Sequence, residues 1–281
     1  IVAGSAVGMA YNMLPRVAKE ASFAADLVPI SLEGRVDQET TLRNFPRYTD
    51  ERYRAYDSHI AKTVTALNAH FKDIPGFKPL DPLIVKAMVI KETGSPHNRE
   101  AFSHDPLQIA NTGDYALDDL KLPETYSRLG LPNGSPIFLR YAHTPRRNGE
   151  WDYSAEQAMM PTDSVYGGII SLYVKAFEYK EATVETGTDL LEYKVRKGDR
   201  LSSVARVRHT TVDTMVKYTP GLNPDKIWPG QKIHFKEAER RVVPSAFNSW
   251  EHAVERYNGN PHYAREVFAL VRSVEEKKSS N

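Results

Sequence analysis

The chain of 281 residues contains no cysteine, and this absence excludes several kinds of chemistry. Without thiols there is no disulfide, no thiolate nucleophile, no cysteine-based zinc site and no iron–sulfur cluster. A strong excess of either charge is also missing, since 37 Lys and Arg stand against 36 Asp and Glu. Proteins that coat nucleic acid usually show a clear basic excess. We therefore expect no nucleic-acid partner.

Long apolar runs and the common catalytic motifs are missing as well. No run reaches the roughly 18 apolar residues that a membrane span needs. The chain has no Gly-x-Ser-x-Gly elbow, no Walker-type loop and no His-Glu-x-x-His helix. The histidines at 97, 104 and 143 lack metal-ligand spacing. We expect no membrane span, no metal and no cofactor.

A composition of 41% hydrophobic and 26% charged residues is typical of a globular protein. A chain of this length forms about two domains, or one domain with an insertion. Helical spacing is clear in three places. The first face consists of Tyr56, Ile60, Val64, Leu67 and Phe71, the second of Val165, Ile169, Leu172 and Ala176, and the third of Ala264, Val267, Phe268 and Val271.

A further helix is predicted from the apolar run Leu83–Ile90. Asp81 and Pro82 give it an N-cap and a first-turn proline, and Gly94 is a natural stop after Glu92. Another helix is expected over 249–257. Residues 95–153 are rich in Gly, Pro, Asn and Asp, which predicts a long functional loop, and 182–189 has the composition of a linker.

Residues 191–237 differ from the rest of the chain in the secondary structure that their sequence predicts. An alternating strand leads to the turn at Gly198-Asp199, two short helices follow, and a Pro-Gly turn precedes a closing strand. This βααβ order, with its Tyr-x-Val-x-x-Gly-Asp and Pro-Gly-Gln signatures, resembles the LysM module, which binds N-acetylglucosamine-containing glycans such as peptidoglycan and chitin. The segment carries ten Lys or Arg and five Asp or Glu, a net charge of +5, which favours an anionic polymer.

The resemblance implies a sugar groove between two loops of this module. The loops correspond to 198–201 and 221–227, so the implied sugar-binding residues are Gly198, Asp199, Arg200, Leu201 and Ile227. Two positions depart from the family pattern. Arg200 replaces a small hydroxyl residue, and Thr219 stands where Asn often precedes the proline.

Glu92 ends an otherwise apolar helix, so its carboxyl is expected to lie against hydrophobic surface. Desolvation and the negative end of the helix dipole both raise the pKa of a carboxyl group. A carboxyl that stays protonated near neutral pH can donate its proton to a glycosidic oxygen. Glu92 is therefore a candidate general acid.

The pattern around Glu92 resembles the catalytic motifs of the lysozyme-like superfamily, which includes soluble lytic transglycosylases and goose-type lysozymes. Four segments carry the resemblance, in the family's order: 89–94 with Glu92, 105–109 with Gln108, 163–169 with its Gly-Gly pair, and 256–259 with Tyr257 and Asn258. It implies that Glu92 is the general acid and that Gln108, Tyr257 and Asn258 position the sugar. Asp-Pro-Leu-Gln replaces the family's usual Gly-Leu-Met-Gln.

The second carboxylate decides the type of reaction. A hydrolase needs a group that activates water or stabilises the oxocarbenium ion. The candidates are Asp105 and Asp114, with Glu100 less favoured. In a lytic transglycosylase, the resemblance implies a single Glu, because the 6-hydroxyl of the substrate attacks. The acidic loop favours a muramidase, and the transglycosylase stays open.

The predicted fold is α+β and mainly α: a lysozyme-like helical domain interrupted by a small βααβ module. The expected division is 1–188 for the first part of the catalytic domain, 189–238 for the LysM-like insert and 239–281 for C-terminal helices that complete the catalytic domain. We expect cleavage of the MurNAc-β-1,4-GlcNAc bond of peptidoglycan glycan strands. A non-catalytic wall-binding module is the alternative from another class.

The expected place of action is the bacterial cell wall, in the periplasm or outside the cell. Because the chain begins at Ile1, we expect a piece of a longer protein whose export route is not encoded here. A phage-tail domain, a secreted autolysin or an antibacterial secretion-system effector would fit. In the effector case an immunity or inhibitor protein is the expected partner.

Overall fold

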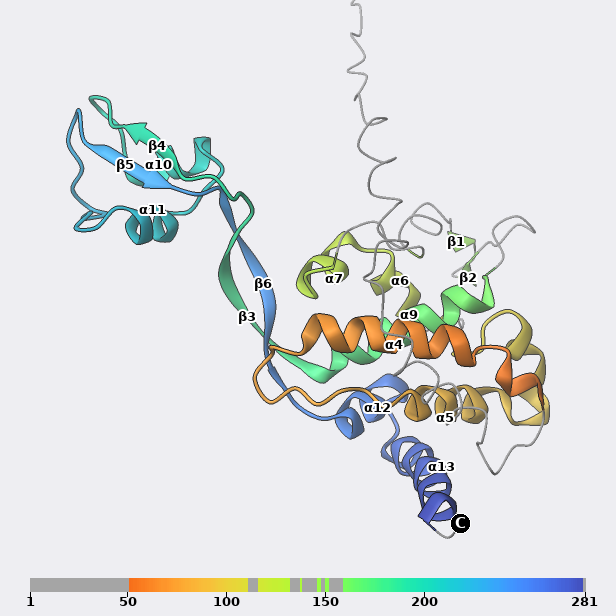
Figure 1. Ribbon diagram of the computed structural model, residues 1–281. Coiled ribbons are helices and arrows are strands. Elements are labelled where there is room, and N and C mark those ends of the chain that lie inside the picture. The colour runs from red at the N-terminus through yellow and green to blue at the C-terminus, as the bar shows by residue number, and fades with distance from the viewer. Residues whose placement is uncertain are drawn as a thin grey trace, which may run out of the picture. The chain divides into compact units, whose positions relative to one another are not determined.

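The computed structural model describes residues 51–110, 116–131, 137, 146–147, 150–151 and 159–279. The described residues fall into two compact units. The first is helical and consists of residues up to Tyr126, from Leu131 to Ala176 and from Phe247 onward. The second consists of Ser127–Gly130 and Phe177–Ala246 and holds two small sheets. The fold is thus α+β and mainly α, as predicted (Figure 1).

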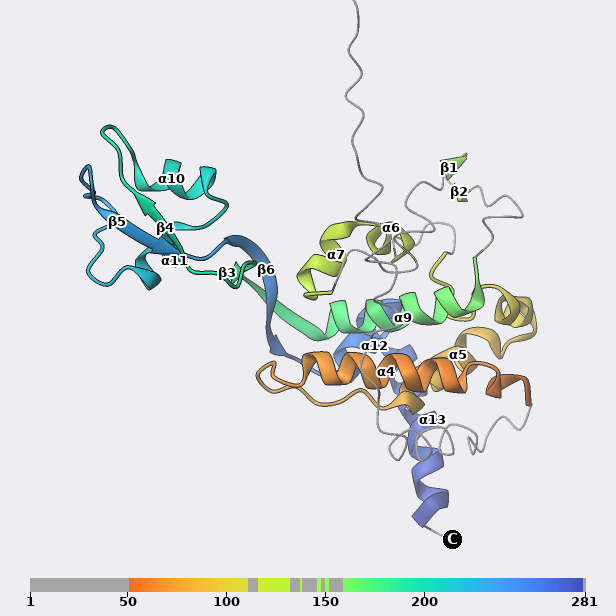
Figure 2. The ribbon, with the colours of Figure 1, turned by 45° about the horizontal axis from the view of Figure 1, so that its top comes forward.

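The helical unit is built around α4 (Asp57–Phe71), α5 (Pro82–Thr93) and α9 (Pro161–Ala176). Helices α4 and α9 run alongside one another in both views (Figures 1 and 2). The apolar faces predicted for them are confirmed, because every residue predicted at 56–71 and at 165–176 is buried. Asp81 caps α5 by accepting the Leu83 amide at 2.8 Å, also as predicted. Helix α5 is buried nearly all round, so it lies at the centre of this unit.

One ion pair lies inside this helical core. Lys86 of α5 donates to both carboxylate oxygens of Asp57, each at 2.8 Å, and the two side chains are 3% and 2% exposed. Asp57 begins α4, so the pair fixes the start of α4 against the middle of α5. The apolar run around Lys86 gave no indication of the acidic partner with which it is buried.

The C-terminal helices α12 (Trp250–Asn258) and α13 (Pro261–Ser279) belong to the same unit. Helix α12 packs on α9, and α13 packs on α5. Ser249 caps α12 by accepting the His252 amide, and Gly259 ends it with a φ of 75°, a left-handed conformation that glycine adopts without strain. An aromatic cluster holds the start of α12; its rings are Phe71, Phe77, Tyr173, Phe247 and Trp250.

Two predictions of loop structure were wrong over part of their ranges, and residues 111–115, 132–136, 138–145, 148–149 and 152–153 of the first lie outside the described residues. The region predicted as a long loop contains η2 (Pro96–Ser103), α6 (Ala116–Leu120), α7 (Pro123–Arg128), β1 (Arg146–Arg147) and β2 (Glu150–Trp151). A short 3-10 helix, η1 (Glu51–Arg54), precedes α4. Of the predicted linker 182–189, residues 182–185 lie in β3 (Phe177–Glu185). This strand pairs with β6 (Ala238–Phe247), at the start of the predicted C-terminal segment, as a two-stranded ribbon. Most ribbon residues are exposed or half-buried on both faces, so no alternation of apolar and polar residues marked the strands.

The predicted βααβ unit is confirmed. Strand β4 (Leu191–Lys194) is followed by α10 (Leu201–Val207), α11 (Val212–Tyr218) and β5 (Lys232–Phe235). The two strands are antiparallel, with Leu191 opposite Phe235 and Lys194 opposite Lys232. The unit has its own core, which consists of Val195, Leu201, Val204, Ala205, Met215, Leu222, Ile233 and Phe235.

Candidate functional site

Glu92 lies in the last turn of α5, where the helix leaves the core. Its side chain is half-buried, whereas Lys91 beside it is exposed and pairs with Glu266 of α13 at 2.5 Å. The Thr93 hydroxyl donates to the Val89 carbonyl at 2.7 Å and so satisfies one carbonyl near the helix end. Glu92 is thus held on a rigid helix beside α13.

Asp105 holds the turn at 105–110 instead of facing solvent. Its buried carboxylate accepts the amides of Ile109 and Ala110, at 3.1 and 2.9 Å, and the Ser164 hydroxyl of α9 at 2.5 Å. The Ser164 oxygen also accepts the Leu107 amide at 3.0 Å. Burial raises the pKa of Asp105, and the hydrogen bonds from Ser164, Ala110 and Ile109 oppose that rise. The structure therefore gives Asp105 a turn-holding role.

Gln108 connects this turn to the end of α5. Its side-chain amide donates to the Glu92 carbonyl at 2.6 Å, so it contacts the backbone of the candidate acid. Gln108 adopts a φ of 51°, an unusual conformation for a residue other than glycine, and the bonds around the turn hold it there. Tyr257 of α12 donates its hydroxyl to the Leu107 carbonyl at 2.6 Å. The turn is therefore attached to α5, α9 and α12 together.

Sequence reasoning missed Tyr263, which lies on α13 near Glu92. Its side chain is 5% exposed and its buried hydroxyl makes no regular hydrogen bond with the described residues. Burial raises the pKa of Tyr263 well above its usual value, and the charge of Glu92, the neighbouring Tyr257 and a weak hydrogen-bonding contact with the Glu92 side chain add to the shift. The sequence feature that could have indicated Tyr263 is its position directly before Ala264, the first residue of the apolar face predicted for α13. That face predicted burial but not the neighbouring acid.

The other predicted residues of this site fall in different places. Asn258 is exposed at the end of α12, one residue beyond Tyr257. Asp114 lies outside the described residues. Glu92, Gln108 and Tyr257, whose segments are spread over about 170 residues of sequence, are brought to one junction.

Gly167 and Gly168 let α9 approach the turn closely. A Cβ at Gly168 would lie 3.0 Å from the Leu107 Cβ, and one at Gly167 would lie 2.6 Å from the Ile109 Cδ1. These distances are shorter than van der Waals contact, so a side chain here must displace the turn. The Gly-Gly pair therefore lets the α9 backbone pack closely against the turn.

We expect Gly168→Val to lower the free energy of unfolding by about 1–3 kcal/mol, because overpacking a dense core forces neighbours to shift. Leu107→Ala alone removes a fully buried side chain and should cost about 2–5 kcal/mol. The double variant removes the Leu107 Cδ1, the atom nearest to a Cβ at Gly168, so its loss should be smaller than the sum of the two. Urea unfolding of the four proteins measures this, and simple additivity would contradict the packing argument.

In the βααβ unit, the residues of the first predicted sugar-binding loop have different surroundings. Gly198 is exposed with a φ of 91°, and a Cβ there would meet nothing within 4 Å. The Asp199 carboxylate accepts the Tyr193 hydroxyl at 2.8 Å and the Arg196 amide at 2.7 Å. Arg200 is exposed. Leu201 is only 4% exposed and belongs to the core, so its side chain offers a sugar no surface.

The second predicted loop surrounds Ile227, which is half-buried against the same core. Trp228, which follows it, is 54% exposed. A family model described as LysM domain matches residues 193–236. This segment is a LysM domain. The match lies within the predicted insert 189–238. A LysM domain is a peptidoglycan-binding module, so the match supports the glycan-binding interpretation of this segment.

The LysM domain associates the protein with the cell wall. No curated protein and no solved structure matches the chain. Within the described ranges, no helix is both long enough and apolar enough to cross a membrane. In the same ranges no group of three metal-ligating side chains is found.

Proposed function

We propose that the protein binds peptidoglycan through its LysM domain and cleaves the glycan strand in its helical unit, with Glu92 as the general acid. The observation that carries the proposal is the junction of Glu92, Gln108, Tyr257 and Tyr263 in a chain that also holds a peptidoglycan-binding domain. A half-buried carboxyl on a fixed helix end is suited to proton transfer, because its orientation is set before the substrate binds.

In the proposed reaction, Glu92 donates its proton to the glycosidic oxygen between N-acetylmuramic acid and N-acetylglucosamine. The C1–O bond breaks, the leaving sugar takes the proton, and an oxocarbenium-like centre develops at C1. Gln108 keeps the Glu92 backbone in place, and Tyr257 fixes the turn that carries Gln108. The buried Tyr263 side chain lies near the acid.

Two product classes follow from this first step. In a muramidase, water attacks C1 and a second carboxylate assists it. The three hydrogen bonds to the buried Asp105 carboxylate disfavour it for that role, so Asp114 becomes the stronger candidate. In a lytic transglycosylase, the 6-hydroxyl of the muramic acid attacks C1 instead, the Glu92 carboxylate takes the proton of that hydroxyl, and a 1,6-anhydro end forms. The engagement of Asp105 is the specific observation that favours this second reaction.

Mass spectrometry of digested peptidoglycan tests the proposal and separates the two reactions. Reducing ends that incorporate solvent oxygen in H₂¹⁸O indicate hydrolysis, and Asp114→Asn should then remove activity. Products one water lighter indicate a transglycosylase, and Asp114→Asn should then leave activity largely intact. Intact glycan strands after long digestion would contradict cleavage and favour the alternative of a non-catalytic wall-binding protein.

The biological setting that we propose is attack on a bacterial wall from the periplasm or from outside the cell. A lytic domain of an antibacterial effector fits this combination of a wall-binding domain and a candidate acid. An immunity protein that covers Glu92 would then be the partner in the producing cell. Co-expression that relieves lysis in the periplasm would identify such a protein.

A further inference from the structure

The positive charge of the LysM domain is concentrated in one segment. Residues 194–208 carry six Lys or Arg and one Asp, a net charge of +5, and the rest of 191–237 is neutral overall. The whole excess therefore lies on the end of β4, the following turn and α10. The six cations are Lys194, Arg196, Lys197, Arg200, Arg206 and Arg208.

These six cations also lack ion-pair partners among the described residues. Elsewhere in the module, Lys217 and Lys236 pair with Glu185, and Lys232 pairs with Glu192, whereas Lys226 is also without an ion pair among the described residues. The charge of each paired cation is largely neutralised by its acidic partner, whereas the charge of each unpaired cation is available to a ligand.

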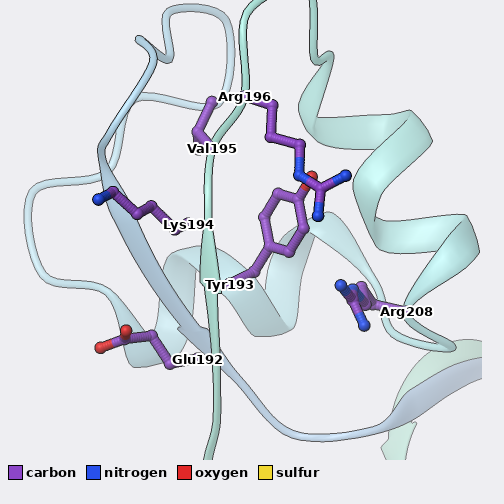
Figure 3. A pocket seen from close by; sticks show the side chains of 6 residues that line it. All are labelled: Glu192, Tyr193, Lys194, Val195, Arg196 and Arg208. Carbon is purple, nitrogen blue, oxygen red and sulfur yellow. The ribbon is translucent and has the colours of Figure 1, made fainter.

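A hollow of about 430 Å³ lies within this basic segment and is lined by Glu192, Tyr193, Lys194, Val195, Arg196 and Arg208. In Figure 3 the Arg196 and Arg208 side chains point toward the Tyr193 ring, and Glu192 and Lys194 point away from it. The Arg208 guanidinium carbon is 4.9 Å from the ring centroid, a cation–π contact. The Tyr193 hydroxyl is fixed by Asp199 at 2.8 Å.

A neighbouring hollow of about 260 Å³ shares Tyr193, Arg196 and Arg208 but also exposes Asp199. Bonds from the Arg196 amide and from Tyr193 lower the pKa of Asp199, so its negative charge persists and disfavours an anion there. In the larger hollow the acid is Glu192, whose charge is directed toward Lys232 at 3.1 Å. The larger hollow is therefore the better place for an anion.

We propose that this larger hollow binds an oxyanion carried by the cell wall, held between the guanidinium groups of Arg196 and Arg208 on the Tyr193 ring. Guanidinium groups form paired hydrogen bonds with carboxylate or phosphate oxygens. No residue of 221–227 lines the hollow, so this site is separate from the sugar groove that the family resemblance implies. The proposal rests on the wall-binding part of the proposed function and not on cleavage.

Two wall components carry such groups: stem peptides with free carboxylates and polymers with phosphodiesters. Binding is measured by calorimetry with the full chain carrying Glu92→Gln, so that the probes stay intact. The four probes are chitotetraose, a disaccharide tetrapeptide with free carboxylates, the same tetrapeptide fully amidated, and a glycerol phosphate oligomer. Arg196→Gln/Arg208→Gln is the test variant. Lys197→Gln/Arg206→Gln is the control, because it removes the same charge from the same segment and lines neither hollow.

We expect the test variant to bind one anionic probe at least about tenfold more weakly and to bind chitotetraose within twofold of its parent. The control should stay within about threefold for every probe. A loss confined to the free-carboxylate tetrapeptide assigns the stem peptide as source, and a loss confined to the glycerol phosphate oligomer assigns the phosphodiester.

Three results would overturn the oxyanion site: no loss for either anionic probe, an equal loss in the control, or an equal loss for chitotetraose. The first means that the hollow is unused, the second that the charge acts without a defined site, and the third that the hollow belongs to the sugar groove. Failure of the parent to bind chitotetraose or whole peptidoglycan would instead contradict the wall-binding function.

Discussion

Lys86→Met is expected to lower the free energy of unfolding of the helical unit by about 3–5 kcal/mol, because it leaves the buried Asp57 carboxylate without its cation. The two side chains are 3% and 2% exposed, so water cannot replace the lost ammonium group without opening the contact between α4 and α5. A buried charge without a partner is among the most costly changes in a protein core. Urea unfolding, followed through the near-ultraviolet signal of the aromatic cluster, measures the loss.

A matched control lies five residues along the same helix. Lys91→Met breaks the ion pair with Glu266, whose side chain is 56% exposed, and should cost less than about 1 kcal/mol. The double variant Asp57→Leu/Lys86→Met removes both buried charges and should regain most of the stability that Lys86→Met loses. If Lys86→Met and Lys91→Met cost the same, the buried pair has no special role in the core.

In the helical unit, local features could be predicted from the sequence, whereas this long-range ion pair could not. The faces of α4 and α9 and the cap of α5 follow from local spacing and from Asp81, so they were predictable. The Asp57–Lys86 contact joins residues 29 positions apart, and only tertiary packing brings them together. Because Lys86 stands in an apolar run, its burial was consistent with the pattern, but its partner was not visible.

The second unit shows the same limit. The βααβ order was predictable because its turns carry Gly198 and Gly230, both at positive φ, and its core residues alternate. The β3–β6 ribbon was not, because its residues are mostly half-buried on both faces, which gives no hydrophobic period. Sequence patterns mark elements that bury one face, and they fail for elements held mainly by backbone hydrogen bonds.

At the candidate site, the resemblance of four sequence segments to a known set of motifs implied one site that contains Glu92, Gln108 and Tyr257. The structure brings these three residues together. The motifs did not predict that the Asp105 carboxylate would accept hydrogen bonds from Ser164 and two backbone amides. The sequence alone does not show whether an aspartate stabilises a turn or is exposed to solvent. The motifs also gave no hint of Tyr263, since that residue lies beyond the last motif. Both features depend on burial, which a motif does not encode.

Glu92→Gln is expected to reduce glycan cleavage by at least about a hundredfold, because general acid catalysis contributes roughly 10²–10⁴ to a rate. Gln has nearly the same shape as Glu but cannot release a proton, and the bond from Gln108 reaches the Glu92 carbonyl, which the substitution keeps. The fold should therefore be unchanged. Release of soluble muropeptides from purified peptidoglycan measures the rate, and sedimentation with intact walls measures binding, which should stay within twofold.

Glu266→Gln is the matched control, since it makes the same chemical change on α13 beside Lys91 and should leave the rate within about twofold. Tyr263→Phe keeps Glu92 and changes only a side chain near it, so it tests how the environment of the acid affects cleavage. It deletes only one buried hydroxyl beside Glu92, so the variant should fold normally. Without that polar group the Glu92 carboxylate is less stabilised, so the pH at which cleavage is half-maximal should rise. If Glu92→Gln digests walls as fast as its parent while Tyr263→Phe leaves the pH profile unmoved, the junction is structural. The LysM domain alone then accounts for what the protein does at the wall.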